Sequence, residues 1–273
     1  MELVSLSVTV TGSGGRYIGD LSAGDFTVLE NGRPQDLVFF ARASTALAVA
    51  LLLDSSASME QQLSVAQKAA SDFVARLRPG DVAQIMDFDS RVQVLQPFTD
   101  DRDALERAIG STTSGGSTSL YNALYIALRQ LETLRPPEGD AIRRNVIVVL
   151  SDGEDTSSLL SFDEVLDAAK RSQSVIYTIG LGLGVEPARR TGGDAEFELR
   201  RFAQETGGRL LVAKDATNLS NVYNQIADEL TSQYVLGYFS SGTQRDGWRS
   251  LSVRVGRPNL QARTRTGYYA STR

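Results

Sequence analysis

The stretch Ala46–Met59, ALAVALLLDSSASM, decides the fold of this chain. Its residues from Ala46 to Leu53 carry no polar side chain, which is typical of a strand buried on both faces, as in a parallel sheet covered by helices. Asp54 then stands at the carboxyl end of that strand, where open α/β sheets place their ligand sites. A helical pattern follows directly, so the stretch predicts a strand–turn–helix unit of an α/β fold.

The turn after this strand carries oxygen atoms at alternate positions, on Asp54, Ser56 and Ser58. In a tight turn such side chains can converge on one point, and a carboxylate with two hydroxyls suits Mg²⁺, Ca²⁺ or Mn²⁺ better than zinc or copper. A second interpretation is open at this point. Ser58 precedes Gln61 by the spacing of a capping box, and Asp54 and Ser56 can be ordinary turn residues.

Two further segments bear on this choice. Gly115–Tyr121, GGSTSLY, opens another helical pattern, and Val146–Asp152, VIVVLSD, is a second apolar strand pattern that ends in an acid. With these segments the chain resembles the von Willebrand factor A-type domain over roughly residues 44–232. The metal-ion-dependent adhesion site of that family reads Asp-x-Ser-x-Ser, then a Thr in a later loop, then an Asp after a later strand. The resemblance implies metal ligands at Asp54, Ser56, Ser58, Thr118 and Asp152.

The resemblance implies a non-catalytic, adhesion-type binding module. Mg²⁺ is the expected metal, with Ca²⁺ or Mn²⁺ possible, and the expected partner is a protein that presents an Asp or Glu carboxylate to the ion. Without a cation, Asp54 and Asp152 would repel each other and the pKa of one carboxyl group would rise. The family suggests an extracytoplasmic location, but the first ten residues, MELVSLSVTV, lack the charged region of a signal peptide, so the compartment stays open.

Composition narrows the remaining classes. The chain has 273 residues, of which 41% are hydrophobic and 22% charged, as in ordinary globular proteins with one large domain or two modest ones. A net charge of −5 does not favour nucleic acid or anionic membranes, and no stretch approaches the about 20 apolar residues of a membrane helix. Because the chain has no Cys and no His, disulfides, Cys/His zinc sites and a His general base are excluded.

Strand and helix patterns alternate over residues 43–232, which predicts a doubly wound, mostly parallel, Rossmann-like sheet. Residues 1–42 predict three strands with a hairpin at Asn31-Gly32, and residues 233–273 predict three more. Neither flank alone has enough strands for a stable core. We therefore expect residues 1–42 and 233–273 to form one split, all-β, sandwich-like domain into which the α/β domain, residues 43–232, is inserted.

The flanks themselves carry a second resemblance, to bacterial von Willebrand A-related proteins. Those proteins have a Gly-Asp-Phe and hairpin pattern before the domain, like Gly24–Phe26 here, and an Arg-x-x-x-Gly-Tyr-Tyr pattern after it, like Arg263–Tyr269. The resemblance does not state what these flanks do.

Two other functions stay open. One is a structural or assembly protein in which the flanking β-domain acts and the metal is incidental. The other is a metal-dependent hydrolase at the same acidic cluster, which is disfavoured because no Lys or Arg stands beside the motif. Glu154 and Asp155 are interpreted as a solvated acidic turn, with a role behind the metal ligands or at the rim of the site as the alternative, and Asp87 and Asp89 as hairpin turn residues.

Overall fold

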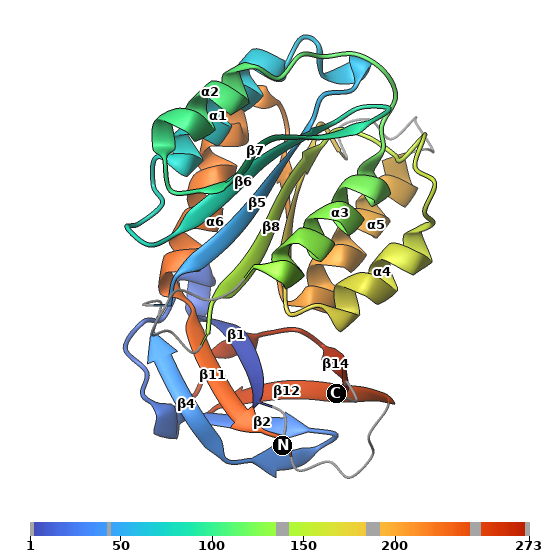
Figure 1. Cartoon of the computed structure of the whole chain (residues 1–273). Helices are drawn as coiled ribbons and strands as arrows, with labels where there is room; N and C mark the ends of the chain where they lie inside the picture. The colour runs from blue at the N-terminus through green and yellow to red at the C-terminus, as the bar shows by residue number, and fades with distance from the viewer. Residues whose placement is uncertain (1–2, 43–44, 135–141, 184–191, 241–246, 271–273) are drawn as a thin grey trace.

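The computed structural model describes residues 3–42, 45–134, 142–183, 192–240 and 247–270. Its central layer is a six-stranded sheet in the order β10-β9-β8-β5-β6-β7 (Figure 1). The described neighbours are parallel except β6 and β7, which form an antiparallel pair at one edge. The strands of this sheet are β5 (Leu47–Asp54), β6 (Val82–Phe88), β7 (Val92–Thr99), β8 (Arg144–Ser151), β9 (Val175–Leu181) and β10 (Leu210–Ala213).

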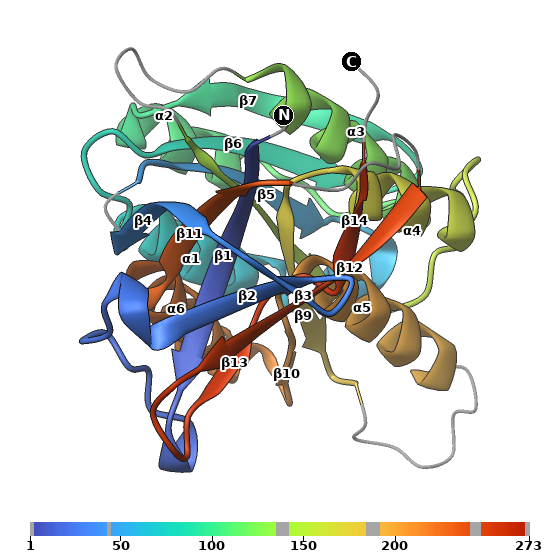
Figure 2. The ribbon, with the colours of Figure 1, turned by 90° about the horizontal axis from the view of Figure 1, so that it is seen from below.

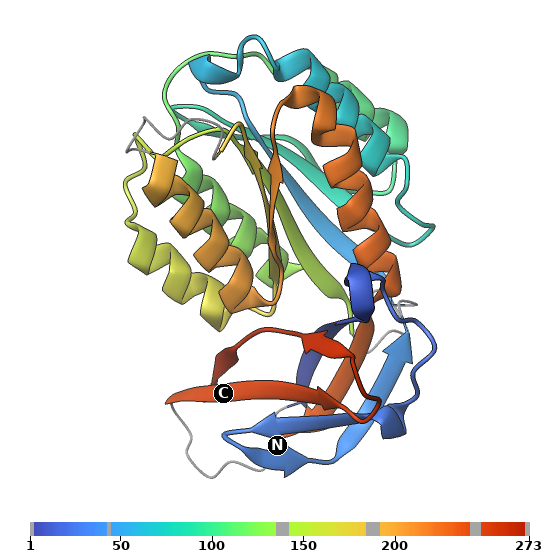
Figure 3. The same cartoon turned by 180° about the vertical axis from the view of Figure 1, so that it is seen from behind.

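Helices cover both faces of this sheet (Figures 1 and 3). One face carries α1 (Leu63–Val74), α2 (Arg102–Gly110) and α6 (Leu219–Ser232). The other carries α3 (Leu120–Thr133), α4 (Phe162–Arg171) and α5 (Gly192–Thr206). Alternate residues of β5 enter the two hydrophobic clusters, which explains why this strand has no polar residue before Asp54. The predicted α/β fold with a mostly parallel central sheet is confirmed.

The structure of the turn after β5 contradicts one of the two interpretations that the sequence left open. A short 3₁₀ turn, Ala57–Met59, follows β5, and α1 begins only at Leu63. Gln62 stands at its N-cap, where no side chain caps the helix. The capping-box interpretation of Ser58 is therefore wrong, because its hydroxyl is bonded to other partners.

The two ends of the chain form two four-stranded sheets below the central layer (Figures 1 and 2). Their orders are β13-β1-β11-β4 and β14-β12-β2-β3. Each sheet joins the two flanks, because β1 pairs with β11 and β2 pairs with β12. The strands are β1 (Leu3–Thr11), β2 (Phe26–Glu30), β3 (Arg33–Gln35), β4 (Leu37–Arg42), β11 (Tyr234–Phe239), β12 (Gly247–Val255), β13 (Gln261–Arg263) and β14 (Gly267–Ala270).

One hydrophobic cluster draws residues from both small sheets, among them Val8 of β1, Val28 of β2 and Leu236 of β11. The predicted hairpin at Asn31-Gly32 joins β2 to β3, with φ angles of 48° and 76° at its two residues. These positive φ values are the ones that a tight hairpin turn requires, and Asn and Gly tolerate them. Three strands were predicted in each flank and the structure has four in each, so β3 and β14 were not predicted from the sequence.

The small sheets and the central unit meet at a buried carboxylate on α6. Glu229 is fully buried and accepts hydrogen bonds from the hydroxyls of Thr9 and Tyr177, at 3.1 and 2.5 Å. It also forms ion pairs with Arg209 and Arg263. These contacts connect α6 and β9 to β1 and β13, so the junction is bonded rather than merely packed. In the part of the chain that the structure describes, no helix is long and apolar enough to cross a membrane.

Candidate functional site

The candidate site lies at the carboxyl end of the central sheet, away from the two small sheets (Figure 1). Asp54 ends β5 and is fully buried. Its carboxylate accepts hydrogen bonds from the backbone N–H of Ser56, at 3.0 Å, and from the hydroxyl of Ser151, at 2.6 Å. Burial raises the pKa of Asp54 to about 6, although these two hydrogen bonds oppose the rise and the charge of Asp152 adds to it. Among the described residues, no cationic side chain pairs with Asp54.

A chain of hydroxyls connects the turn after β5 to the acid after β8. The hydroxyls of Ser56 and Ser58 lie 3.0 Å apart, and Ser58 donates to Asp152 at 3.0 Å. Burial raises the pKa of Asp152, against the opposing effect of the Ser58 hydrogen bond. The structure thus brings together four of the predicted site residues, which are separated by up to 98 positions between Asp54 and Asp152.

The loop of Thr118, the fifth predicted residue, is bonded to the same turn through its backbone. Gly115 donates to the carbonyl of Ser55 at 2.7 Å, and Ala57 donates to that of Gly116 at 3.1 Å. Gly116 has a φ of +71°, and a Cβ atom there would lie 2.6 Å from the Ser90 hydroxyl, so this close approach requires glycine. Thr118 is only 6% exposed, and its hydroxyl has no hydrogen-bond partner among the described residues.

The loop that follows Asp152 is held against the start of α3. The carboxylate of Asp155 accepts hydrogen bonds from the backbone N–H groups of Tyr121 and Ser158, at 3.0 Å each. The Thr156 hydroxyl accepts the N–H of Thr118 at 2.9 Å. The interpretation of Asp155 as a solvated turn residue is therefore wrong, because it anchors this loop. Glu154 differs, since its Oε1 is buried without a hydrogen-bond partner in the described parts of the chain.

Sequence reasoning missed Ser151, and it assigned Asp87 to a hairpin turn although this residue belongs to the strand β6. Ser151 is the last residue of β8, and the register that pairs Leu53 with Leu150 puts Ser151 beside Asp54. Counting two apolar strands of equal length from their starts could have found it. Asp87 of β6 is buried, and burial together with the charge of Asp89 raises its pKa to about 6.

The donor set fits a hard divalent cation. It consists of two carboxylates and three hydroxyls, all of them oxygen donors, which Mg²⁺, Ca²⁺ and Mn²⁺ prefer. Both carboxyl groups have raised pKa values because their charges are buried without a cation. No cluster of three or more His, Cys, Asp or Glu side chains within the described ranges could hold a metal. Any metal here would therefore depend on the Ser and Thr hydroxyls as well as on the acids.

Comparison with known proteins assigns the class of the central unit. Residues 49–154 match the family model described as von Willebrand factor type A domain, so the chain contains a domain of this class. A curated relative, a UPF0353 protein of Mycolicibacterium paratuberculosis, is 28% identical over 223 residues. The match covers 73% of this chain and 66% of that protein, so the chain spans just under two thirds of the relative's length.

Solved structures share the fold at low sequence identity. A von Willebrand factor type A protein from Catenulispora acidiphila has a TM-score of 0.58 at 14% identity and covers 98% of this chain and 62% of its own. The von Willebrand domain of the type V pili tip protein Mfa5 from Porphyromonas gingivalis has a TM-score of 0.56 at 16% identity. The match covers 67% of this chain and 94% of that one. Proximal thread matrix protein 1 from the mussel byssus, with a zinc-occupied MIDAS motif, has a TM-score of 0.56 at 15% identity. The match covers 70% of this chain and 49% of that one.

Proposed function

We propose that this chain is a non-catalytic protein-binding module whose binding depends on a divalent cation. Mg²⁺ is the metal we expect, and Ca²⁺ or Mn²⁺ would suit the same oxygen donors. The observation that carries the proposal is the pair of carboxylates formed by the buried Asp54 and the partly buried Asp152, which are linked through serine hydroxyls and have no cationic partner among the described residues. The proposed ligands are Asp54, Ser56, Ser58, Thr118 and Asp152.

The chemistry of the proposed site follows from its charges. Asp54 and Asp152 contribute two negative charges, and the three hydroxyls contribute none. A bound Mg²⁺ would balance both charges and offer a position to a carboxylate of the partner protein. The raised pKa values of the two acids are consistent with this role, because burial raises both of them and the hydrogen bonds from neutral donors offset the rise only in part.

The loop after Asp152 supplies a feature that a partner could contact. Leu159 is 94% exposed, yet the backbone N–H groups of Leu159 and Leu160 donate to the side chain of Asn122 at 3.3 and 3.4 Å. An apolar side chain is thereby held in solvent on the loop that begins at Asp152. We propose that the partner has an apolar contact next to its acidic group.

Related proteins support a role in adhesion or assembly. Von Willebrand factor type A domains are typically non-enzymatic modules of this kind, and one structural neighbour is a pili tip protein. Another neighbour carries zinc in its MIDAS motif, so domains of this fold bind divalent metals. On this basis we propose an extracytoplasmic site of action for the present chain as well.

We further propose that residues 1–42 and 233–273 form one split, β-sandwich-like domain that carries residues 43–232 as an insertion. Strand pairing between the two ends of the chain supports this division. Deleting residues 234–273 is expected to expose the backbone amides of β1 and β2 to exchange with solvent. If those amides remain protected in the truncated chain, the two flanks do not form one folding unit.

The direct test of metal binding is calorimetry with Mg²⁺ on the whole chain. We expect binding heat with the wild type and its loss in Asp54→Ala, because that substitution removes half of the charge that holds the ion. Asp72→Ala is the matched control, since Asp72 is exposed and pairs only with Lys68. Absence of both binding heat and thermal stabilisation in the wild type would refute the proposal.

Partner binding provides a second test, with and without EDTA. The proposed module should release its partner when the metal is removed. Binding that is indifferent to EDTA would favour the alternative, in which the flanking strands act in assembly and the metal is incidental.

A further inference from the structure

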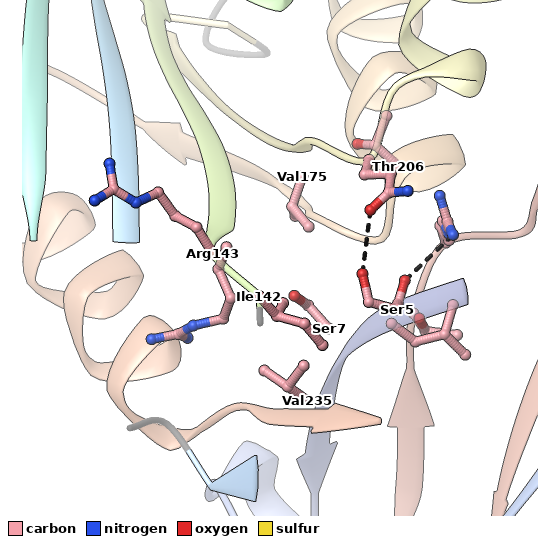
Figure 4. Close-up of a pocket in the computed structure, with 12 residues that line it drawn as sticks. Ser5, Ser7, Ile142, Arg143, Val175, Thr206 and Val235 are labelled. Carbon is pink, nitrogen blue, oxygen red and sulfur yellow. Dashed lines mark hydrogen bonds between the residues drawn. The ribbon is translucent and has the colours of Figure 1, made fainter. Parts of the chain in front are cut away.

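A second polar site lies at the opposite end of the central sheet, between the von Willebrand domain and the small sheets. An open crevice of about 620 Å³ runs between β1 and the starts of β8 and β9, and Ser5, Arg143, Asn145, Gln173 and Ser174 are among its lining residues. A narrower recess of about 20 Å³ adjoins it and shares Ser5, Arg143 and Gln173 (Figure 4). The recess is large enough for about one water-sized group.

The recess is positively charged in a protein that is acidic overall. Of its described lining residues, three are arginines, Arg143, Arg144 and Arg265, and none is Asp or Glu. The net charge of the whole chain is −5, so this concentration of positive charge is local. A low-dielectric cleft lined by one sign of charge raises the local concentration of the opposite ion.

The three arginines are engaged to different degrees. Arg144 donates to the carbonyl oxygens of Thr45 and Leu230, at 3.0 and 2.7 Å. Arg265 donates to the carbonyl of Ser5 at 3.2 Å. Arg143, by contrast, forms no hydrogen bond or ion pair with any described residue, and its Nε is buried. An arginine normally satisfies this planar set of donors with a carboxylate, a phosphate or carbonyl oxygens.

Other donors around Arg143 are also left without partners. Ser174 is only 4% exposed and lines the crevice, and its hydroxyl makes no hydrogen bond with the described residues. The hydroxyl of Thr264, which lines the recess, is also buried and makes no hydrogen bond with the described residues. Unpaired buried polar groups are costly, so such a concentration of free donors points to a ligand that accepts hydrogen bonds. Asn145 adds an acceptor, Oδ1, that has no partner among the described residues, and Glu132, the one acid among the described lining residues, pairs with Arg129.

We propose that this crevice binds an oxyanion, a carboxylate or a phosphate group, with Arg143 as its main charged contact and the hydroxyl of Ser174 as a further donor. The anion can belong to a small molecule or to an acidic side chain of a partner. Because β1 lines the crevice from the flank, and Asn145 of β8 with the residues just before β9 line it from the central domain, the bound anion would also connect the two parts. This site does not depend on the metal site proposed above.

The test is titration of the whole chain, in EDTA and at constant ionic strength, with inorganic phosphate, citrate and an Ac-Glu-Glu-NH₂ peptide. We expect at least one of them to bind and to raise the melting temperature. Arg143→Gln should weaken that binding at least about tenfold, the loss expected for one charge-assisted contact. Arg254→Gln is the matched control, because Arg254 is exposed and lines neither cavity.

Further variants separate the outcomes. Arg143→Lys keeps the charge without the planar donors and should bind with intermediate affinity, and Asp54→Ala should bind the anion as the wild type does. Tighter binding of the peptide than of phosphate and citrate would identify a partner side chain as the source. The proposal would be overturned if the wild type and Arg143→Gln bound these anions with equal affinity. It would also be overturned if chloride raised the melting temperature as much as these anions do. The proposal would also be overturned if the wild type bound no anion and only the double variant Glu138→Gln/Asp140→Gln did. Both acids lie within five residues of Arg143 in the sequence.

Discussion

Buried carboxylates at the two ends of this molecule have opposite surroundings. At the carboxyl end of the central sheet, Asp54 is buried with hydrogen-bond donors but no described cation, and its pKa is raised to about 6 by burial. In the small sheets, Glu30 is 4% exposed and lies 3.0 Å from Arg249. Burial tends to raise the pKa of Glu30, but hydrogen bonds from Tyr238, Tyr268 and Ser240 and the charge of Arg249 lower it overall.

This difference separates structural acids from candidate ligands. Glu30 and Glu229 have arginines and hydroxyls that neutralise and solvate their charges inside the protein. Among the described residues, Asp54 and Asp152 accept hydrogen bonds only from neutral donors, so no described side chain neutralises their charge. Burial alone therefore does not distinguish the candidate metal ligands from the structural acids, whereas burial without a cationic partner does.

The largest effect is expected from breaking a paired buried acid. Glu229→Ala leaves Arg209 and Arg263 without their carboxylate and should lower the free energy of unfolding by about 3–5 kcal/mol. Urea denaturation of the whole chain measures this loss. Glu132→Ala, which removes an exposed acid, serves as control, and a Glu229→Ala protein as stable as that control would contradict the distinction drawn here.

The unpaired acid should respond in the opposite direction. Asn at position 54 can accept the Ser56 N–H with its Oδ1 and donate its amide N–H to the Ser151 hydroxyl, which can then donate to the carbonyl of Gly153, while removing a charge that is costly to bury. With the pKa raised from 3.8 to about 6, the ionised form destabilises the folded state as pH rises through this range. In EDTA at pH 7, Asp54→Asn should therefore gain about 2–3 kcal/mol of stability.

The same variant should lose the stabilisation by Mg²⁺ that we expect of the wild type. Melting curves with Mg²⁺ and with EDTA measure both effects on one protein. A loss of stability in EDTA would mean that the charge of Asp54 is compensated within the fold, which would remove the main argument for the metal site.

A smaller effect is expected in the dependence of folding stability on pH below about 4.5. Because the pKa of Glu30 is lowered from its ordinary value of 4.5, its ionised form contributes stability that is present above that value and is lost as pH falls through the folded pKa. Below pH 4.5 the wild type should lose stability more steeply than Glu30→Gln, by at most about 1.4 kcal/mol per pH unit, one proton's worth. Urea midpoints between pH 5 and pH 3 measure this slope, and parallel curves would contradict it.

Much of the fold could be predicted because it follows from local patterns. The apolar run of β5, the hairpin residues Asn31-Gly32 and the alternation of strands with helices each act over a few residues. The strand β14 was missed because its four residues, Gly267–Ala270, are too few to show a period and pair with β12 only in the folded chain. The first turn of α1 was placed too early because Ser58 matched a capping pattern that tertiary contacts override.

The candidate site could be predicted only in part. The resemblance to a known family named five residues, and the structure links four of them by hydrogen bonds and fixes the loop of the fifth. Ser151 was not predicted, and the supporting role of Asp155 was only the less favoured alternative, because their partners, Asp54 and Tyr121, lie 97 and 34 positions away. The anion crevice had no signal in the sequence, since its residues come from segments that meet only at the junction.

The smallest effect completes the comparison, because it concerns an acid that is paired but exposed. Asp167 accepts a hydrogen bond from Arg171 at 2.8 Å, and this bond is the main reason why its pKa is lowered. The side chains of both residues are about half exposed, at 45% and 56%, so water and salt screen the pair. Asp167→Asn should therefore change the free energy of unfolding by less than about 1 kcal/mol. A loss comparable to that of Glu229→Ala would show that pairing itself, rather than pairing under burial, distinguishes the structural acids of this protein from the candidate metal ligands.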